Sequence, residues 1–479
     1  MHQHSPSPSG ITVKLATGQA VALIVFSSWA LGGRYPGSSF YIGSIAWLGL
    51  IPLIRYWYER EGHGFKKWAL CLSPWLLLIT QLVVGYLNPM RKPQNNTESA
   101  FVVWDSIEPI AGIPVCFNPI RTQEYIWIFI GALITATSVF TIIQQKKQVI
   151  TLLSLIGING VILAVIGAWF KITHNPEVLG MFEAVNPRFY SSFRYYNHWV
   201  AFALLSLGSA VTVADNYIQH YNRTGWNVRG RQRWDIVWVT IAAIIWVSIP
   251  LSGSRSGMIF SALFIFGSGA YLVFAYRRRT SIFSHLERQT RKALGISLLA
   301  FLAIFSFVGF ALVWDNLNYR LEKTKEEIGQ GRIDQRFYAS PRDCWKMVKD
   351  RPVWGWGLGS YAYVFYQYAG PEYRHPLGKI VKRNEYAHND WMQYWVELGT
   401  VGYVLFLSVP VGIIVLTFRR PRKSPESYWL AFSIGLFLSF ASFDFPFGPS
   451  AGIALFAVCF GACARLSLGP SKEKTSYYD

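Results

Sequence analysis

The chain has 479 residues, of which 52% are hydrophobic and only 15% charged, against about 25% charged residues in soluble domains. Aromatic residues make up 16%, and the formal net charge is +19. This composition excludes an ordinary soluble protein and predicts an all-α integral membrane protein. The basic residues lie in short clusters between apolar segments, so we expect a lipid bilayer, and no nucleic acid, as their partner.

Twelve apolar segments are long enough to cross a bilayer, which takes roughly 17 to 25 helical residues. We therefore predict about 12 transmembrane helices, at residues 15–33, 40–57, 68–88, 123–143, 149–170, 198–214, 235–252, 257–276, 293–313, 398–418, 427–445 and 448–466.

The loops that follow the even-numbered spans, counted with Arg55 at the end of the second span, hold twenty Lys and Arg residues, whereas the short loops on the other side hold eight. Basic loops stay in the cytoplasm, so both termini are expected there and the long polar loop is expected outside. The predicted divisions are helices one to nine with short loops at 1–313, a large, partly helical external loop at 314–397, helices ten to twelve at 398–469, and a cytoplasmic tail at 470–479.

Small residues surround Arg255 in a tight outer turn between spans seven and eight, from Ser252 to Gly257. Glycines let the backbone approach a ligand closely, and Ser254 adds a hydroxyl. An arginine at the membrane edge is costly without a partner. Arg255 is therefore either a ligand for an anion or an interfacial arginine that reaches the lipid headgroups.

The external loop contains Arg336 early and alternating glycines from Gly355 to Gly359. The strand that precedes a nucleotide-binding glycine motif is missing, so we predict a compact turn at these glycines. Arg336 by itself is either a solvated charge or a phosphate ligand. Near the end of the loop, Asp390 and Gln393 have the spacing of a capping box, which predicts a helix that starts at Asp390 and continues into span ten.

His388 lies just before this predicted helix. The positive end of the helix favours a neutral imidazole, which can take a proton from a hydroxyl; the alternative is an interfacial histidine that hydrogen-bonds to the loop. Two guanidinium groups can bind a diphosphate. We therefore predict that Arg255 and Arg336 hold a diphosphate leaving group while His388 activates a hydroxyl.

Few other residues have the pattern of a site. No His, Cys, Asp and Glu residues have the spacing of a metal site, so neither a metal nor another cofactor is expected. Cys116 and Cys344 both fall in predicted external segments, where an oxidising compartment would allow a disulfide bond, but sequence alone does not establish pairing. Asp444, at the outer end of a span, is the ionisable residue nearest to a span interior.

Several motifs together resemble the O-antigen ligase / O-antigen polymerase superfamily, over roughly residues 190–402. They are the turn Ser254–Gly257, the Arg336 region leading to Pro352–Gly357, the segment His388–Gly399, and the run Arg194–Trp199, which is similar to the family's asparagine-containing signature.

Members of that superfamily are polytopic, GT-C-type glycosyltransferases of the bacterial inner membrane. The resemblance implies an inverting, metal-independent transfer of a glycan from undecaprenyl diphosphate to an acceptor hydroxyl at the periplasmic face. It places Arg255 and Arg336 on the diphosphate and His388 as the base. The supporting residues would be Ser254, Arg194, Asn197 and Asn389. The acceptor is lipid A–core in ligases, another glycan repeat in polymerases and a protein hydroxyl in protein O-oligosaccharyltransferases, and the sequence leaves this choice open.

Two features depart from the family pattern. The stretch between Arg336 and Pro352 is about one residue longer than expected, which makes Arg332 or Arg342 an alternative equivalent. The tyrosine-rich segment at 362–383 is peculiar to this chain, and its rings either stack on sugars or pack the loop against the membrane. The alternative of a different class is a polytopic transporter. Transporters place ionisable residues inside their spans, and almost none are expected in these spans.

Overall fold

The structure is a computed structural model. It describes residues 8–35, 37–60, 65–93, 104–184, 188–224, 233–277, 318, 322, 325–326, 340–370, 385–419 and 426–469. The predicted ninth span (293–313) and the tail at 470–479 lie outside these residues, as does Arg336.

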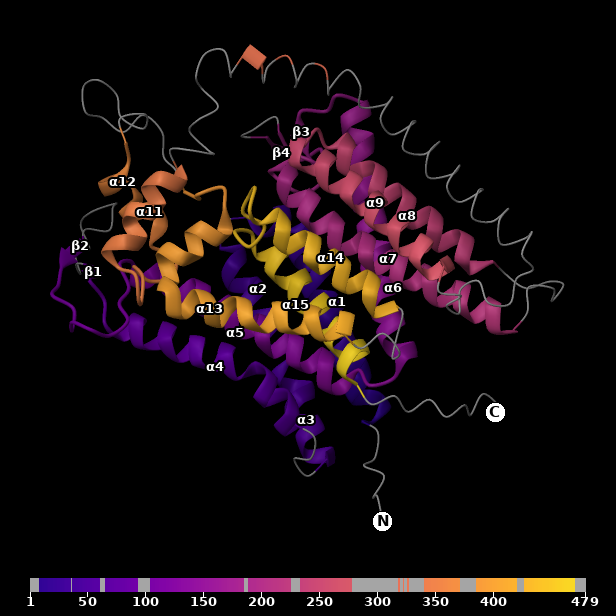
Figure 1. The fold of residues 1–479 in the computed structure, drawn as a ribbon, viewed down its shortest axis with the longest axis horizontal. Coiled ribbons are helices and arrows are strands. Elements are labelled where there is room, and N and C mark those ends of the chain that lie inside the picture. Colours follow the sequence, from indigo (N-terminus) through magenta and orange to yellow (C-terminus); the bar gives the residue numbers. More distant parts are fainter. Residues whose placement is uncertain are drawn as a thin grey trace.

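The described chain is mostly helical (Figure 1). Its helices before the external segment are α1 (Gly10–Trp29), the 3-10 helix η1 (Leu31–Gly33), α2 (Ser38–Trp47), α3 (Leu50–Arg60), α4 (Phe65–Leu87), α5 (Pro119–Ile142), α6 (Lys146–Ile172), α7 (Tyr196–Thr224), α8 (Trp234–Leu251) and α9 (Arg255–Arg277). The later helices are α11 (Ser340–Asp350), α12 (Tyr361–Tyr368), α13 (Asp390–Arg419), α14 (Glu426–Phe440) and α15 (Ser450–Leu468).

Two short antiparallel hairpins interrupt the helices. In the first, β1 (Arg91–Pro93) pairs with β2 (Trp104–Ser106), and Lys92 lies opposite Asp105. In the second, β3 (Glu177–Val178) pairs with β4 (Phe182–Glu183). Both lie in segments between long helices, so they do not change the predicted all-α class.

Nine helices within the described ranges are long and apolar enough to cross a membrane. They are Gly10–Trp29, Ser38–Glu59, Trp68–Leu87, Pro119–Ile142, Lys146–Ile172, Tyr196–His220, Trp234–Leu251, Asp390–Arg419 and Ser450–Leu468. The membrane class predicted from composition is therefore confirmed, while the total of twelve spans stays a prediction.

Three predicted spans differ from the observed helices. The second is broken between α2 and α3. The sixth is longer than predicted, since α7 continues past residue 214 and buries Asp215. The eleventh is shorter, because α14 ends at Phe440 and residues 441–449 form a buried turn that contains Asp444. Helices α7 and α13 bury Asp215, Asp390 and Glu397, but these residues lie just outside the predicted spans, so the expectation that those spans hold almost no ionisable side chain stays a prediction.

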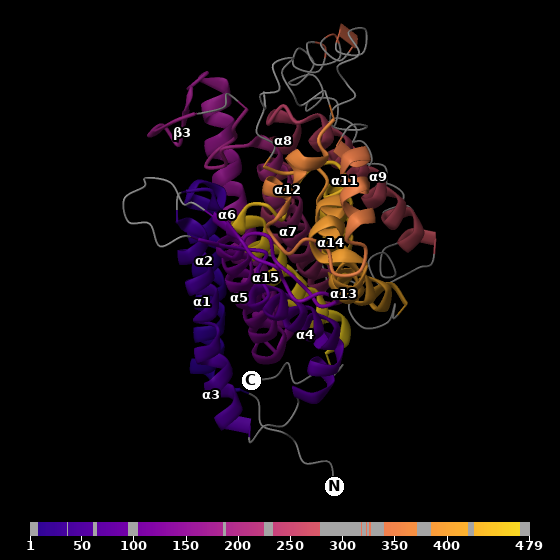
Figure 2. The same cartoon turned by 90° about the vertical axis from the view of Figure 1, so that its left-hand side faces the viewer.

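Polar contacts between sequence-distant loops gather at two opposite ends of the bundle. At the end that we call inner, Ser9 contacts Glu59, Lys146 contacts Glu426, and Arg465 donates to the carbonyl of Gln144. At the other end, called outer, Asn88 and Cys116 pair through their backbones, the amide of Phe117 donates to the carbonyl of Trp356, and Arg34 pairs with Glu385. Figure 2 shows α11, α12 and β3 in the upper half and α3 at the bottom.

The outer end has a small hydrophobic core of its own. Helices α11 and α12 pack their apolar residues, including Cys344, Met347 and Phe365, against Phe117 and the first turns of α13. Tyr361 is completely buried in this core, and Tyr363, Tyr366 and Tyr368 pack around it. The described tyrosines of α12 therefore serve mainly to build the outer core, and Tyr373 lies outside the described residues.

The alternating glycines form the predicted compact turn. Gly355, Gly357 and Gly359 all have positive φ, of 70°, 91° and 78°. A Cβ on Gly357 would lie 2.5 Å from the Cα of Cys116. The turn is held by the buried carboxylate of Glu397, which accepts hydrogen bonds from the amides of Gly359 (2.9 Å) and Tyr361 (3.1 Å).

Candidate functional site

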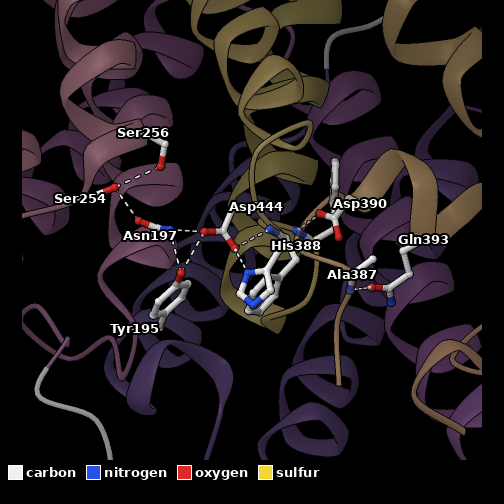
Figure 3. A network of polar contacts seen from close by, with 11 residues as sticks. Tyr195, Asn197, Ser254, Ser256, Ala387, His388, Asp390, Gln393 and Asp444 are labelled. Atoms are coloured by element: carbon white, nitrogen blue, oxygen red, sulfur yellow. Dashed lines mark hydrogen bonds and ion pairs between the residues drawn. The ribbon is translucent and has the colours of Figure 1, made fainter. Parts of the chain in front are cut away.

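A continuous row of polar side chains crosses the outer end of the bundle, from the start of α9 to the start of α13 (Figure 3). Ser254 donates to the side-chain oxygen of Asn197, and the amide nitrogen of Asn197 donates to the carboxylate of Asp444. His388 closes the row, with its Nδ1 3.3 Å from Oδ1 of Asp444. The row joins α7, α9, α13 and the turn after α14.

Asp444 is the centre of this row. Its side chain is 2% exposed, and its Oδ2 accepts a hydrogen bond from the hydroxyl of Tyr195 at 3.1 Å in addition to that from Asn197. Its Oδ1 accepts from the backbone amide of Phe445 at 2.9 Å. A buried carboxylate is stable only when its oxygens are hydrogen-bonded, and the remaining direction of Oδ1 faces the imidazole of His388.

His388 has a backbone φ of 54°, in the left-handed region that few residues other than glycine adopt. Its side chain is 22% exposed, and its ring meets Phe445 edge-on at 4.9 Å between centroids. In the neutral imidazole, the carboxylate beside Nδ1 favours the tautomer in which Nδ1 carries the proton and Nε2 has the lone pair. The imidazole therefore has one nitrogen oriented by Asp444 and the other available as a proton acceptor.

The backbone locks His388 to the turn that carries Asp444. Helix α13 begins at Asp390, as predicted, but its cap is Asn389, whose Oδ1 accepts from the amide of Met392 at 3.1 Å. The predicted cap, Asp390, instead accepts from the amide of Phe447 at 2.9 Å. Its own amide donates to the carbonyls of Ala441 (2.8 Å) and Asp444 (3.3 Å). Asp390 thus fixes the distance between the two segments of the site.

At the other end of the row, Ser254 caps α9. Its Oγ accepts from the amide of Gly257 at 2.9 Å and lies 3.2 Å from the hydroxyl of Ser256. Arg255 is the first residue of α9 and directly follows Ser254. It is exposed, so it lies at the rim of the site. The N-terminus of a helix attracts negative charge through its free amides and its dipole.

The comparison with known protein families bears on this site directly. Residues 239–407 match the family model described as O-antigen ligase. About a third of the chain, from α8 into α13, is therefore similar to the O-antigen ligase family. The match contains the Arg255 turn, Arg336 and His388, whereas Asn197 and Asp444 lie outside it. No curated protein matches the chain.

The residues carried over from the O-antigen ligase resemblance have different outcomes. Ser254, Asn197 and His388 are brought together through Asp444. Arg255 adjoins them along the chain. Asn389 caps α13, and its supporting role in the site stays a prediction. Arg194 precedes Tyr195, but its Nε is buried with no hydrogen-bond partner among the described residues, and no contact links it to the row.

Arg336 and its alternative Arg332 lie outside the described residues, so their roles stay predictions. The third alternative, Arg342, bonds the carboxylate of Asp343 with Nε at 2.9 Å and Nη2 at 3.1 Å. It belongs to α11, which packs in the outer core. This engagement makes Arg342 a weaker candidate than Arg336 for the diphosphate of an O-antigen ligase-like site.

Sequence reasoning missed two members of the site, Asp444 and Tyr195. A signal for Asp444 was available, since a lone carboxyl group between Phe443 and Phe445 at the end of an apolar span demands a partner. The identity of that partner was not, because His388 is 56 residues away along the chain. Tyr195 lies in the run that resembles the family signature but was not singled out.

The possible disulfide bond between Cys116 and Cys344 is absent. Both side chains are buried in or beside the outer core. Burial raises the pKa of the Cys116 thiol to about 11, although a hydrogen bond with Thr122 opposes the shift. Cys116 is therefore an unreactive packing residue under neutral conditions.

Proposed function

We propose that the protein transfers a glycan from undecaprenyl diphosphate to an acceptor hydroxyl at the periplasmic face, with inversion at the anomeric carbon. The family match supports a glycosyltransferase of the O-antigen ligase type. The observation that carries the mechanism is the contact between His388 Nδ1 and Asp444 Oδ1 at 3.3 Å. It leaves Nε2 of His388 as a base at one end of the polar row, whose other end, Ser254, directly precedes Arg255.

In this mechanism Nε2 of His388 takes the proton of the acceptor hydroxyl as its oxygen attacks the anomeric carbon. The bond from that carbon to the diphosphate oxygen breaks, and undecaprenyl diphosphate leaves with the electron pair. Asp444 holds the imidazole and stabilises the imidazolium that forms. Arg255 and Arg336 offset the charge that develops on the diphosphate. Since these cations supply that stabilisation, the proposal requires no metal ion.

Substitution of the base tests this proposal. We expect His388→Ala to lower transfer by roughly 100-fold or more, the typical contribution of a positioned general base, and Arg255→Ala to lower it as well. His174→Ala is a matched control, because His174 is an exposed outer histidine whose φ is also positive, at 53°. Transfer would be measured with purified protein of confirmed abundance. Wild-type transfer by His388→Ala protein would contradict the mechanism.

The acceptor is decided by a separate experiment. In cells that lack the protein, gel analysis of surface polysaccharide distinguishes loss of all attachment, expected for a ligase, from loss of long chains only, expected for a polymerase. We propose the ligase reaction first because the matching family model is described as O-antigen ligase. Polysaccharide polymerisation and protein O-glycosylation are the alternatives within the superfamily, and the match does not favour a transporter.

A further inference from the structure

Arg34 lies at the outer end, directly after η1, and packs against the His388 end of the site. The carbon of its guanidinium lies 5.1 Å from the ring centroid of Tyr386 and 5.9 Å from that of Phe445. Its ion pair with Glu385 is long, at 3.5 Å, and the two side chains are 28% and 51% exposed. Such an exposed pair is weak, so a ligand can displace Glu385 and engage the five N–H donors of the guanidinium.

His198 contacts the same aromatic ring, that of Phe445. Its side chain is 3% exposed, and its Nε2 is buried without a hydrogen-bond partner among the described residues. The ring stands edge-on to Phe445 at 4.8 Å and to Tyr195 at 5.1 Å. A buried polar atom that lacks a partner calls for a water molecule or a ligand, and here its ring contacts the same phenylalanine as the ring of the proposed base.

Phe445 connects these groups, since its ring contacts Arg34, His198 and His388. It follows directly on Asp444 and stacks on Tyr386 at 4.3 Å. The guanidinium of Arg34 and the imidazole of His198 therefore both contact the ring of Phe445, which also contacts the imidazole of the proposed base. Together they provide a positive charge and a hydrogen-bonding group, which is the combination that an oxyanion requires.

The position of Arg34 separates it from the proposed leaving-group site. Arg255 lies at the Ser254 end of the polar row, whereas Arg34 is attached to the His388 end through Tyr386 and Phe445. In a displacement with inversion, the attacking oxygen and the leaving oxygen lie on opposite sides of the anomeric carbon. A cation at the base end therefore faces the acceptor rather than the departing diphosphate.

We propose that Arg34 and His198 form a second anion-binding subsite, which takes a phosphate or carboxylate group carried by the acceptor saccharide. The inference rests on the proposed transfer reaction for the direction of the acceptor, but the anion binding itself does not require transfer. The guanidinium supplies the charge, and the imidazole nitrogen orients one oxygen of the ligand.

Binding of small saccharides to the full-length protein in lipid nanodiscs tests the subsite, by calorimetric titration without donor. The probes are glucose 6-phosphate and glucuronate, with glucose as the neutral counterpart and inorganic diphosphate as the probe of the leaving-group site. We expect the two acidic sugars to bind more tightly than glucose. Arg34→Gln should weaken their binding by about tenfold and leave glucose unaffected. Arg121→Gln is the matched control, because Arg121 is an outer arginine paired with Glu124 at 2.8 Å.

Two further variants distinguish a ligand site from a structural anchor. Glu385→Gln removes the ion pair but keeps the charge of Arg34, so acidic sugars should bind as tightly as before or more tightly. His198→Gln keeps a side-chain amide and should retain binding better than His198→Phe, which keeps only the ring. Weaker binding by Glu385→Gln protein would show that Arg34 serves only to hold the outer segment, and equal binding by the two His198 variants would remove the imidazole from the subsite.

The diphosphate probe separates this inference from the transfer reaction. Arg255→Gln should weaken binding of inorganic diphosphate, and Arg34→Gln should not. If Arg34→Gln weakened diphosphate as strongly as Arg255→Gln, Arg34 would belong to the donor site and the acceptor subsite would be refuted. Unchanged binding of acidic sugars by Arg34→Gln protein would refute it as well. Absence of transfer by the wild-type protein would contradict the proposed function but leave these binding results intact.

Discussion

The carboxylate of Asp444 determines the orientation of the His388 imidazole, since the two groups meet at 3.3 Å and the other oxygen of Asp444 is held by Tyr195 and Asn197. An asparagine at position 444 would present either its side-chain oxygen or its NH2 group to Nδ1 of His388. In the second case Nδ1 must accept the hydrogen bond, and the proton then occupies Nε2, where the base should have its lone pair.

We therefore expect Asp444→Asn to lower transfer by on the order of 100-fold, by analogy with the loss of the orienting carboxylate in catalytic triads, while the protein still folds. Transfer and thermal unfolding would be measured on the same preparations. Glu108→Gln is a suitable control, because Glu108 is an exposed carboxylate of the outer end. An Asp444→Asn protein with full transfer activity would show that His388 needs no partner.

Among individual residues, the sequence predicted His388, Ser254 and Asn197 as members of one site, because each lies in a motif of contiguous residues. It did not predict Asp444 as their common partner. The contacts of Asp444 with Tyr195, Asn197 and His388 span 249, 247 and 56 residues. Such contacts depend on how the helices pack, which no local pattern encodes.

Several turns, rather than the helices alone, hold the outer end together. Gly357 illustrates this: its φ is 91°, and a Cβ there would collide with the backbone of Cys116 at 2.5 Å. Gly112 also has a positive φ, of 81°, but a Cβ there would meet no atom within 4 Å. The two glycines therefore separate the effect of backbone conformation from that of close packing.

We expect Gly112→Ala to destabilise the protein by about 1 kcal/mol, the strain of a left-handed alanine. Gly357→Ala should cost at least about 2 kcal/mol more, because the backbones of two segments must move apart. Chemical unfolding followed by tryptophan fluorescence would measure both. Equal destabilisation by the two substitutions would show that the turn adapts and that the contact with Cys116 is unimportant.

The carboxylate of Asp343 connects α11 to the end of α12. Burial by itself would raise its pKa, but hydrogen bonds from Arg342, the amide of Gly370 and Lys346 outweigh burial and hold the pKa below its ordinary value. A carboxyl group whose pKa is lower in the folded state contributes stability above its unfolded pKa. That stability is lost as the pH falls through the folded pKa.

We therefore expect the unfolding temperature of the wild type to decrease as the pH is lowered below the ordinary Asp value of about 3.9. Asp343→Asn should be less stable than wild type at pH 7, and its unfolding temperature should depend less on pH in the acid range. Thermal unfolding at pH values from neutral to acid checks both expectations. A pH dependence identical to that of the wild type would show that other carboxyl groups determine acid stability.

A helix start was predictable where polar residues have the spacing of a cap, as at Asp390, although the capping side chain is that of Asn389. Element boundaries were not predictable where tertiary packing decides. The stretch 427–445 is apolar enough for a full span, yet the chain leaves the helix at Phe440 and turns so that Asp444 reaches the site. Likewise, the sequence did not decide whether the tyrosines of α12 stack on sugars or pack within the protein. Only the structure shows that they pack in the outer core that contains Tyr361.

For the molecule as a whole, sequence and structure bear on its orientation in independent ways. The loops after even-numbered spans carry twenty basic residues, counting Arg55 at the end of the second span, and the opposite short loops carry eight, which predicts that the first set is cytoplasmic. The contacts Lys146–Glu426 and Gln144–Arg465 lie at the inner end. Helices α11 and α12 lie at the outer end, as does His388. If the charge rule holds, the whole outer end is periplasmic.

Cysteine labelling tests this orientation with two exposed lysines at opposite ends, Lys349 in α11 and Lys147 in α6. In intact spheroplasts, a membrane-impermeant maleimide should label Lys349→Cys, whereas Lys147→Cys should react only after permeabilisation. The unaltered protein is the control, because its cysteines are buried except Cys71, which lies in the apolar α4. Labelling in the reverse order would place His388 in the cytoplasm. A lipid-linked donor would then have to be used before it crosses the membrane, and the proposed periplasmic reaction would fail even if His388 remained the base.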